Sequence, residues 1–384
     1  MKRKVIVLGG GIAGLTSAIN IKKTIKTSDV TIIDNSQFHV FKPFLHDLLT
    51  NKKRVENVVI PFSGITKSKG INYENKKALS IAPEQKHVRT GTEKISYDYL
   101  ILAIGGEPNY HNIKGVKTHA LTFHNIIDVT RLKESVSTSL SKARNMKGDK
   151  LNELLTFTII GGGVGSVELA CYLKELVQKK MREYNIKKNA RIIIIGNNKK
   201  ILKNFPTSIR KKVISRLNDL RIETLLGYEV KQIRKNHVLL KNKIVRSGTI
   251  IWCGGVKPNN VVKESRLKTK NGGVLVNSTL QSTSHNSVFT MGDCAFLVND
   301  NFNKSFSKNA YNTLKQANLV SKNLLNWIKD KKMRKFKPSR NKGFLRLGSD
   351  FAIFYYKNLV LQGFLISKIY AIILKHRFNL SKTI

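Results

Sequence analysis

Acidic residues are scarce in this chain. Its 384 residues include 24 Asp and Glu against 69 Lys and Arg, which gives a formal net charge of +45. Such a charge attracts polyanions, among them nucleic acid, anionic lipid and acidic proteins. The basic residues are scattered, however, and neither zinc-ligand spacing nor an aromatic and basic platform accompanies them. The sequence therefore argues against nucleic-acid binding and predicts no metal site.

Cysteine is also rare. Cys171, Cys253 and Cys294 are odd in number and far apart. This excludes a disulfide framework and favours a reducing compartment. It also excludes the closely spaced pair, C-x-x-C or C-x₄-C, that a redox-active disulfide needs. The cysteines are therefore predicted to have no catalytic role.

Long apolar runs are missing as well. A membrane-spanning helix needs about 20 apolar residues, and the sequence contains no such segment. The basic residues 1–4 resemble the start of a signal peptide, but the apolar run that follows, Val5–Leu8, ends at once in Gly9. That run is predicted to be a strand and not an export signal.

The C-terminal apolar stretch, Phe364–Leu374, is too short and too charged to span a bilayer. At helical spacing, Ile366, Ile369, Tyr370 and Ile373 share one face, and basic residues flank it. This pattern is typical of a helix that lies in a membrane interface, where anionic lipids attract the basic flanks. The alternative is that the helix packs on its own domain or on a second copy of the chain.

Glycine, in contrast, is concentrated after apolar strands. The strand Lys4–Leu8 is followed by Gly9, Gly11 and Gly14 in the G-x-G-x-x-G spacing and then by a helical pattern. In this fingerprint the first glycine turns the chain, the second admits a pyrophosphate, and the third lets helix and strand pack closely. The next strand ends in Asp34, about 20 residues after Gly14, where a ribose hydroxyl needs an acceptor. This unit is predicted to bind a dinucleotide.

The same pattern recurs at Phe157–Ala170. Gly161 and Gly163 repeat the first two glycines, and the small Ser166 replaces the third. Two such units predict two dinucleotides. The following strand, Arg191–Gly196, ends in glycine and not in a carboxylate.

The missing carboxylate bears on the choice of nucleotide. Without it nothing at this position repels a 2′-phosphate, and Lys199 and Lys200 follow closely. Basic residues near this position accommodate NADP. We therefore expect discrimination between NADH and NADPH to be weak or tilted towards NADPH, unless Glu223 or Glu229 supplies an acceptor from another loop.

Alternating strands and helices predict an α/β fold with two Rossmann-like dinucleotide-binding domains and a small C-terminal membrane-associating region. The expected first domain combines residues 1–122 and 270–330, the second spans 123–269, and the C-terminal region is 331–384. Smaller expectations are a strand at Val55–Ile60, a helix at Ala310–Ile328, a basic linker at 331–342, and a hairpin of Phe351–Tyr356 and Leu359–Leu361.

In their order along the chain these segments resemble the two-dinucleotide flavoproteins, and among them the type II NADH:quinone oxidoreductases. The motifs that carry the resemblance are Gly9–Gly14, Asp34, Leu102–Gly105, Gly161–Glu168, Trp252–Gly255 and Met291–Ala295. The resemblance covers essentially the whole chain. It implies an NAD(P)H:quinone oxidoreductase of electron transport, in which NADH or NADPH reduces FAD and the FAD reduces a membrane quinone.

The resemblance also implies the site residues. Those expected at FAD and the nicotinamide nucleotide are Gly9, Gly11, Ala13, Gly14, Asp34, Lys42, Ala103, Gly105, Gly161, Gly163, Glu168, Gly254, Gly292 and Asp293. Asp293 would bond the ribityl chain of FAD. Glu168 and Lys42 are the expected catalytic residues, and Lys42 lies in an aromatic loop, Gln37–Leu49, that either covers a flavin ring or lines the core.

In the same family an A-Q-x-x-x-Q-Q motif lines the quinone pocket. The corresponding stretch here is Ala310–Gln316. Its first and last residues match the motif, whereas Tyr311 and Lys315 stand where the motif has glutamine. Tyr311, Lys315 and Gln316 are therefore the expected quinone site, with the acceptor's identity left open.

The implied partners are a membrane quinone, an anionic membrane surface and, as an option, a second copy in a homodimer. The implied location is peripheral, on the cytoplasmic face of the cell membrane. Three alternatives compete. One is a soluble ferredoxin- or rubredoxin-type reductase, whose acidic partner would suit the positive charge. The second is a sulfide:quinone-reductase-like flavoprotein with another donor, and the third is a flavin-bearing interaction protein without a working nicotinamide site.

Overall fold

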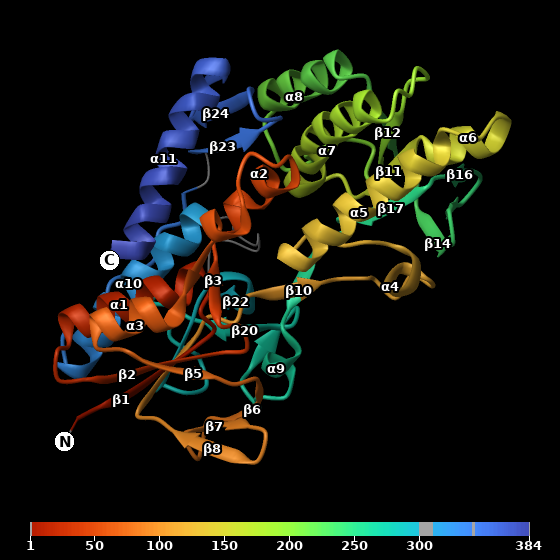
Figure 1. Ribbon diagram of the computed structural model, residues 1–384. Helices are drawn as coiled ribbons and strands as arrows, with labels where there is room; N and C mark the ends of the chain where they lie inside the picture. Colours follow the sequence, from red (N-terminus) through yellow and green to blue (C-terminus); the bar gives the residue numbers. More distant parts are fainter. Residues whose placement is uncertain (1, 299–309, 340–341, 384) are drawn as a thin grey trace.

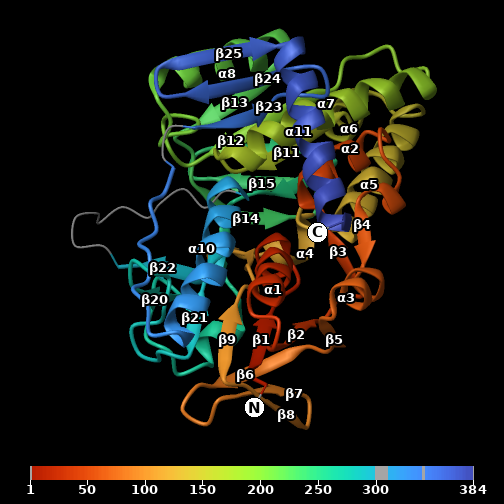
Figure 2. The same ribbon diagram turned by 90° about the vertical axis from the view of Figure 1, so that its left-hand side faces the viewer.

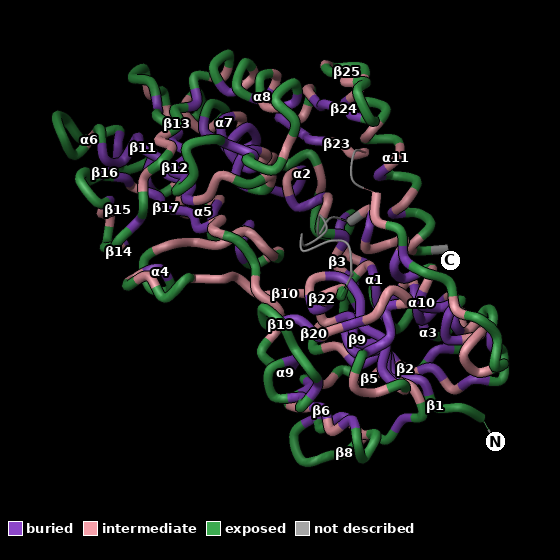
Figure 3. The backbone as a smooth tube through the Cα atoms, turned by 180° about the vertical axis from the view of Figure 1, so that it is seen from behind, coloured by how far each residue is buried: buried purple, intermediate pink, exposed green. Residues whose placement is uncertain are grey.

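The computed structural model describes residues 2–298, 310–339 and 342–383. Two lobes, each built on a parallel sheet, are joined by a narrow crossing, and the C-terminal helix runs alongside them (Figure 1). The apolar strands lie at the centre of each lobe, as the buried segments in Figure 3 show. The predicted α/β class is confirmed.

The first lobe contains a five-stranded sheet with the order β21-β9-β1-β2-β5, in which all neighbours are parallel. Its strands are β1 (Lys4–Leu8), β2 (Asp29–Asp34), β5 (Asn72–Asn75), β9 (Tyr99–Leu102) and β21 (Val288–Thr290). The pairing of β21 with β9 means that the chain returns to this sheet after forming the second lobe. Helices α1 (Ile12–Thr24) and α10 (Ala310–Ile328) pack on each other, and Ser321 Oγ donates to Ser17 O at 3.3 Å.

The second lobe contains a four-stranded parallel sheet with the order β13-β12-β11-β17. Its strands are β11 (Thr156–Ile160), β12 (Arg191–Gly196), β13 (Ile222–Leu226) and β17 (Thr249–Trp252), and its longest helices are α5 (Ile126–Ala143), α7 (Val164–Glu183) and α8 (Thr207–Asp219). The isoleucine run Ile192–Ile195 is buried throughout. Such continuous apolar strands suit a parallel sheet that is covered on both faces.

The two lobes meet where β10 (Gly106–Pro108) pairs antiparallel with β18 (Val256–Pro258). Smaller sheets decorate both lobes: β3 (Phe38–Val40) with β4 (Val59–Pro61); β6 (Ala78–Ala82), β7 (His87–Thr90) and β8 (Glu93–Ser96); β14 (Val230–Arg234), β15 (His237–Leu240) and β16 (Ile244–Arg246); β19 (Thr269–Lys270), β20 (Gly273–Val276) and β22 (Ala295–Leu297). The expected strand at Val55–Ile60 is wrong in its first half, because Val55–Asn57 form a 3₁₀ turn and the strand begins only at Val59.

Short helices fill the connections. They are α2 (Leu45–Leu49), α3 (Phe62–Lys69), α4 (Val116–His119), α6 (Gly148–Leu154) and α9 (Asn260–Lys263), with 3₁₀ turns at Lys42–Phe44 and Gly292–Cys294. The two 3₁₀ turns hold residues expected at the cofactor.

The C-terminal region forms a three-stranded antiparallel sheet and a helix (Figure 2). The expected hairpin is present as β24 (Ala352–Tyr356) and β25 (Leu359–Gly363). A third strand, β23 (Lys342–Arg346), pairs with β24 beyond the predicted basic linker. The sequence did not predict this strand, because residues 342–346 show no alternation of apolar and polar side chains and only Phe344 and Leu345 are large and apolar.

Helix α11 (Phe364–Thr383) is longer than expected. Its far end packs on the first lobe, where the Phe378 ring lies 5.6 Å from Phe41 and 5.4 Å from Phe44. Near its start, Tyr370 stacks on Phe344 of β23 at 4.2 Å. Within the described ranges, no helix is long and apolar enough to cross a membrane.

The expected interfacial face of α11 lies partly over a cavity. Ile366, Ile369, Tyr370 and Ile373 line a cavity beneath the helix rather than pointing wholly outward. The most exposed apolar side chains lie beside them: Leu365 at 73%, Ile372 at 69% and Phe364 at 55%. The expected face is therefore partly covered, because residues of β23 and β24 line the same cavity, while Ile369 remains 50% exposed.

Candidate functional site

The first glycine turn, between β1 and α1, is closely packed. Gly9 adopts a positive φ of 99°, and a Cβ there would lie 2.6 Å from Ala103 O. A Cβ on Gly14 would lie 1.8 Å from Gly9 O, so any larger residue would force α1 away from β1. At Gly11, in contrast, a Cβ would meet nothing within 4 Å. The turn therefore has two glycines that pack and one that leaves room, as a pyrophosphate site requires.

Asp34 lies at the end of β2, beside this turn. Its carboxylate accepts hydrogen bonds from Gly10 N–H at 2.6 Å and from Ser36 N–H at 2.8 Å. Each carboxylate oxygen can accept a second bond. Asp34 can therefore shape the turn and still accept a ribose hydroxyl.

The 3₁₀ turn at Gly292–Cys294 faces the same region. Gly292 N–H donates to Gln316 Oε1 at 2.8 Å, and the Gln316 side chain is fully buried. Gln316 Nε2 is buried with no hydrogen-bond partner in the described part of the chain. A buried amide donor without a partner is costly, and it fits a site that a polar cofactor completes.

Lys42 and Asp293 both lie close enough to His124 for their charges to affect its pKa. Burial lowers the pKa of His124, Lys42 lowers it further, and the carboxylates of Asp128 and Asp293 oppose this. Lys42 is exposed at the start of its 3₁₀ turn. Ala13 and Ala103 are buried, and Gly105 lies between β9 and β10. Together these residues fit the expected FAD.

The second glycine turn, between β11 and α7, has the same construction. Gly161 adopts a φ of 140°, and a Cβ there would lie 2.3 Å from Cys253 O and 2.6 Å from Ser166 Oγ. Ser166 is buried against Gly161, so the serine fills the place of a third glycine. A Cβ on Gly163 would meet nothing within 4 Å.

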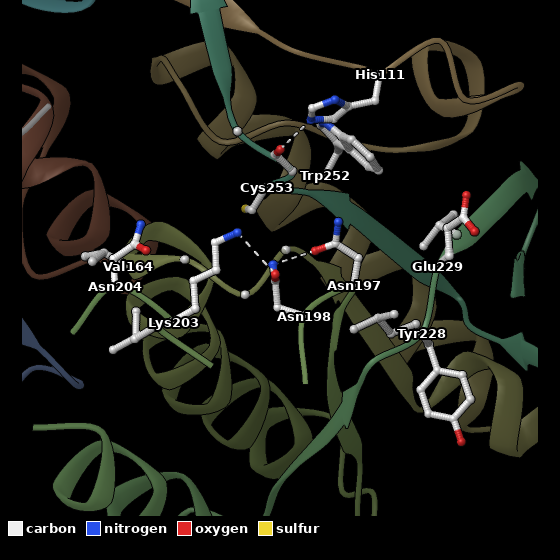
Figure 4. A pocket seen from close by; sticks show the side chains of 18 of the residues that line it. His111, Val164, Asn197, Asn198, Lys203, Asn204, Tyr228, Glu229, Trp252 and Cys253 are labelled. Atoms are coloured by element: carbon white, nitrogen blue, oxygen red, sulfur yellow. Dashed lines mark hydrogen bonds between the residues drawn. The ribbon is translucent and has the colours of Figure 1, made fainter. Parts of the chain in front are cut away.

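A cleft of about 510 Å³ opens at this turn (Figure 4). Its lining includes the turn Gly161–Gly163, Asn197, Asn198, Lys203, Tyr228, Glu229, Trp252, Gly254 and His111. Gly254 is required beside Trp252, because a Cβ there would lie 2.3 Å from the indole ring, and its carbonyl accepts a bond from His111 Nε2 at 2.9 Å. Sequence reasoning missed His111, Lys203 and Tyr228, which belong to no motif.

The structure separates the candidate acidic and basic residues near β12. Glu223 forms a two-bond ion pair with Arg191, at 2.8 and 2.7 Å, at the opposite end of the sheet from the glycine turn. Glu229 lines the cleft and pairs with Lys231 at 2.7 Å. Lys203 lines the cleft, whereas Lys199 and Lys200 are not among its lining residues.

An apolar cavity of about 750 Å³ lies between α11, β23, β24 and α10. Tyr311 lines it together with Phe344, Tyr355 and Tyr370. The other two expected quinone residues lie elsewhere: Lys315 Nζ donates to Lys337 O at 2.9 Å, and Gln316 supports Gly292. Val164 and Phe205 line both this cavity and the nucleotide cleft.

A model of the pyridine nucleotide-disulphide oxidoreductase family matches residues 3–318. The chain belongs to this family. A curated relative, the type II NADH:quinone oxidoreductase of Staphylococcus aureus, is 23% identical over 84% of this chain and 82% of its own length. Among solved structures, NDH2 of Plasmodium falciparum in complex with NADH has a TM-score of 0.88 at 19% identity, over 100% of this chain and 98% of that one. The sulfide:quinone oxidoreductase of Aquifex aeolicus has a TM-score of 0.81 at 17% identity, over 99% and 92%.

In this member of the pyridine nucleotide-disulphide oxidoreductase family, a buried charged cluster joins three distant segments. Arg346 of β23 forms two bonds to the Asp47 carboxylate, at 2.6 and 3.0 Å, and both side chains are 9% exposed. Arg346 N–H donates to Glu168 Oε1 at 2.8 Å. Burial raises the pKa of Glu168 to about 7, although the Arg346 N–H and charge oppose the shift. Glu168 is therefore partly protonated near neutral pH.

Proposed function

We propose that this chain transfers a hydride from a reduced nicotinamide nucleotide to FAD and passes the electrons to a membrane quinone. One observation carries the proposal: the nucleotide cleft and the apolar cavity share Val164 and Phe205 as a common wall. A polar dinucleotide site therefore lies directly beside a site that suits an apolar ring. The activity named for the relative from Staphylococcus aureus supports the same assignment.

FAD, when bound, supplies the group that accepts a hydride and releases electrons to the acceptor. The residues that would hold it are Gly9, Gly11, Ala13, Gly14, Asp34, Lys42, Ala103, Gly105, Gly292 and Asp293. Gln316 holds the Gly292 turn and directs an amide donor that lacks a protein partner. The chain's task here is to bind, to orient and to exclude water.

The nicotinamide nucleotide would lie in the cleft at Gly161, Gly163 and Gly254. Quinone reduction consumes protons. Glu168, whose pKa burial raises to about 7, is the candidate donor, although it is not among the residues that line the cleft or the cavity. The paired Arg346 holds this carboxyl group in place through its backbone N–H. Lys42 remains the second candidate catalytic residue, on the basis of its position near His124 and Asp293.

A thiol relay has little support in this arrangement. Burial raises the pKa of Cys253 to about 12 and also raises that of Cys171, so both thiols stay protonated at neutral pH. The thiolate is the reactive form. Direct transfer between nucleotide, FAD and acceptor is therefore the simpler route.

The quinone would enter through the cavity beneath α11, beside Tyr311. Exposed Phe364, Leu365 and Ile372, with Lys368 and Lys375 on the same helix, would place this entrance against an anionic lipid surface. Apolar side chains with basic neighbours are typical of peripheral membrane helices. We propose the cytoplasmic face of the cell membrane as the location, and a homodimer as a further option.

Anaerobic mixing of the purified holoenzyme tests this function. NADH or NADPH should bleach the flavin absorbance, sulfide should not, and a short-chain quinone should restore it. Bleaching by sulfide alone would replace the nicotinamide donor with sulfide. No bleaching by any of the three would favour a protein without this reductase activity.

A further inference from the structure

The part of the nucleotide cleft at the end of β12 has an unusual charge distribution. The strand ends in Gly196 and is followed by Asn197 and Asn198, so no carboxylate stands where a ribose 2′-hydroxyl commonly finds its acceptor. Glu223 is held by Arg191 at the far end of the strands. Within the described lining of the cleft, Glu229 is the one remaining carboxylate.

Lys203 is positioned in the cleft by the backbone of the preceding residue, Leu202. Leu202 adopts a φ of 49°, which a bulky residue rarely takes, and its N–H donates to Gly162 O of the glycine turn at 2.9 Å. This bond ties the loop after β12 to the glycine turn. Lys203 Nζ then donates to Asn198 Oδ1 at 3.2 Å, and Asn198 Nδ2 donates to Asn197 Oδ1 at 2.8 Å.

Figure 4 shows Lys203 on one side of the two asparagines and Glu229 on the other. The Glu229 carboxylate is 2.7 Å from Lys231 Nζ, and its side chain is 62% exposed. Its charge is therefore largely balanced and screened by water. The Lys203 ammonium, by contrast, is held in the cleft by one neutral amide oxygen and has donors left for an anion.

We propose that this cleft takes NADPH in preference to NADH, and that Lys203 and Asn198 bind the 2′-phosphate. The inference rests on the proposed function, since it names the substrate of the same site. A 2′-phosphate carries nearly two charges at neutral pH and forms charge-assisted bonds with an ammonium. NADH presents only a hydroxyl there and finds no carboxylate acceptor from β12.

The experiment compares two fragments of the nucleotide that lack the nicotinamide ring and therefore cannot transfer a hydride. Isothermal titration calorimetry on the FAD-loaded protein measures the dissociation constants of adenosine 2′,5′-bisphosphate and adenosine 5′-monophosphate. The salt concentration is about 0.15 M, at which distant charges are screened. We expect the bisphosphate to bind at least about tenfold more tightly, as for a hydrogen bond to a charged group. Equal affinities, or tighter binding of the monophosphate, would overturn the proposal.

Matched variants separate a specific site from general attraction to a positive protein. Lys203→Gln should remove most of the bisphosphate preference, whereas Lys200→Gln changes the charge equally in the same loop but outside the cleft lining and should leave it intact. Asn197→Asp adds a carboxylate at the strand end and should also reduce the preference. Equal losses in the two lysine variants would show that net charge, and not Lys203, attracts the phosphate.

The ratio of the two fragment affinities does not depend on turnover, so it tests the phosphate site separately from the reductase function. If the bisphosphate preference is found but neither NADH nor NADPH bleaches the flavin, the reductase function fails while the phosphate site stands. If NADH bleaches the flavin and the fragments bind equally, the function stands and the NADPH assignment fails.

Discussion

At the scale of single residues, the buried carboxyl group of Glu168 has the clearest consequence. Its pKa in the folded protein is about 7, against an ordinary value of 4.5. The folded protein therefore retains a proton that the unfolded chain releases between these values, and this contribution to stability is present below about pH 4.5 and lost as the pH rises through 7. We expect the wild type to lose up to about 3 kcal/mol relative to Glu168→Gln between pH 4.5 and 8.

Urea denaturation of both proteins across this range measures the difference. His46 titrates in the opposite sense, since burial and the Arg346 charge lower its pKa to about 3, so acid removes stability through it. That effect is common to both proteins and cancels in the comparison. Parallel pH profiles would mean that Glu168 ionises as a surface carboxylate does.

At the scale of elements, α11 and the sheet before it connect the lobes to the proposed membrane surface. Deleting this region would leave Asp47 without Arg346, and an unpaired buried charge is strongly destabilising. The double variant Leu365→Glu with Ile372→Glu is cleaner because both side chains are exposed. Because two apolar side chains no longer enter the lipid interface, the affinity for anionic vesicles, measured by flotation, should fall at least about tenfold.

Ile127→Glu with Ile244→Glu is the matched control, since both residues are exposed apolar side chains of the second lobe. Its flotation should match that of the wild type apart from a small loss for the added negative charge. If the α11 variant floats as well as the control, the exposed face of this helix is not the membrane contact.

At the scale of the whole molecule, FAD should stabilise the fold by linkage. The expected FAD residues come from segments far apart in the chain, from Gly9 to Asp293, and the unfolded chain cannot assemble them. At 100 times the dissociation constant, a ligand of this kind adds about 2.7 kcal/mol to the free energy of unfolding. Thermal unfolding of flavin-stripped protein should therefore move to a higher temperature when FAD is restored.

Flavin mononucleotide is the informative control for that measurement. It lacks the adenosine half, for which the glycine turn and Asp34 are built, and should raise the unfolding temperature much less. An equal shift with both flavins would contradict the assignment of Gly9, Gly11 and Asp34.

Features that depend on neighbouring residues could be predicted from the sequence alone. Strand β12 and helix α10 lie where expected, and both glycine turns were predictable because a tight turn and a close helix–strand approach restrict the residue at each position. The parallel architecture followed from the continuous apolar strands. Three of the residues predicted for the first site, Gly9, Gly14 and Asp34, depend on such local rules, whereas Gly292 and Asp293 were expected from the family resemblance.

Contacts between segments that share no local pattern could be found only in the folded molecule. Asp47 and Arg346 form their ion pair across nearly the whole chain, and neither belongs to a motif. Gln316, expected at the quinone, supports the Gly292 turn, because one face of α10 is packed on the first lobe. Lys203, and not Lys199 or Lys200, entered the nucleotide cleft because Leu202 is bonded to the glycine turn. Spacing along a chain predicts which face a residue occupies, but the packing of distant segments determines what that face contacts.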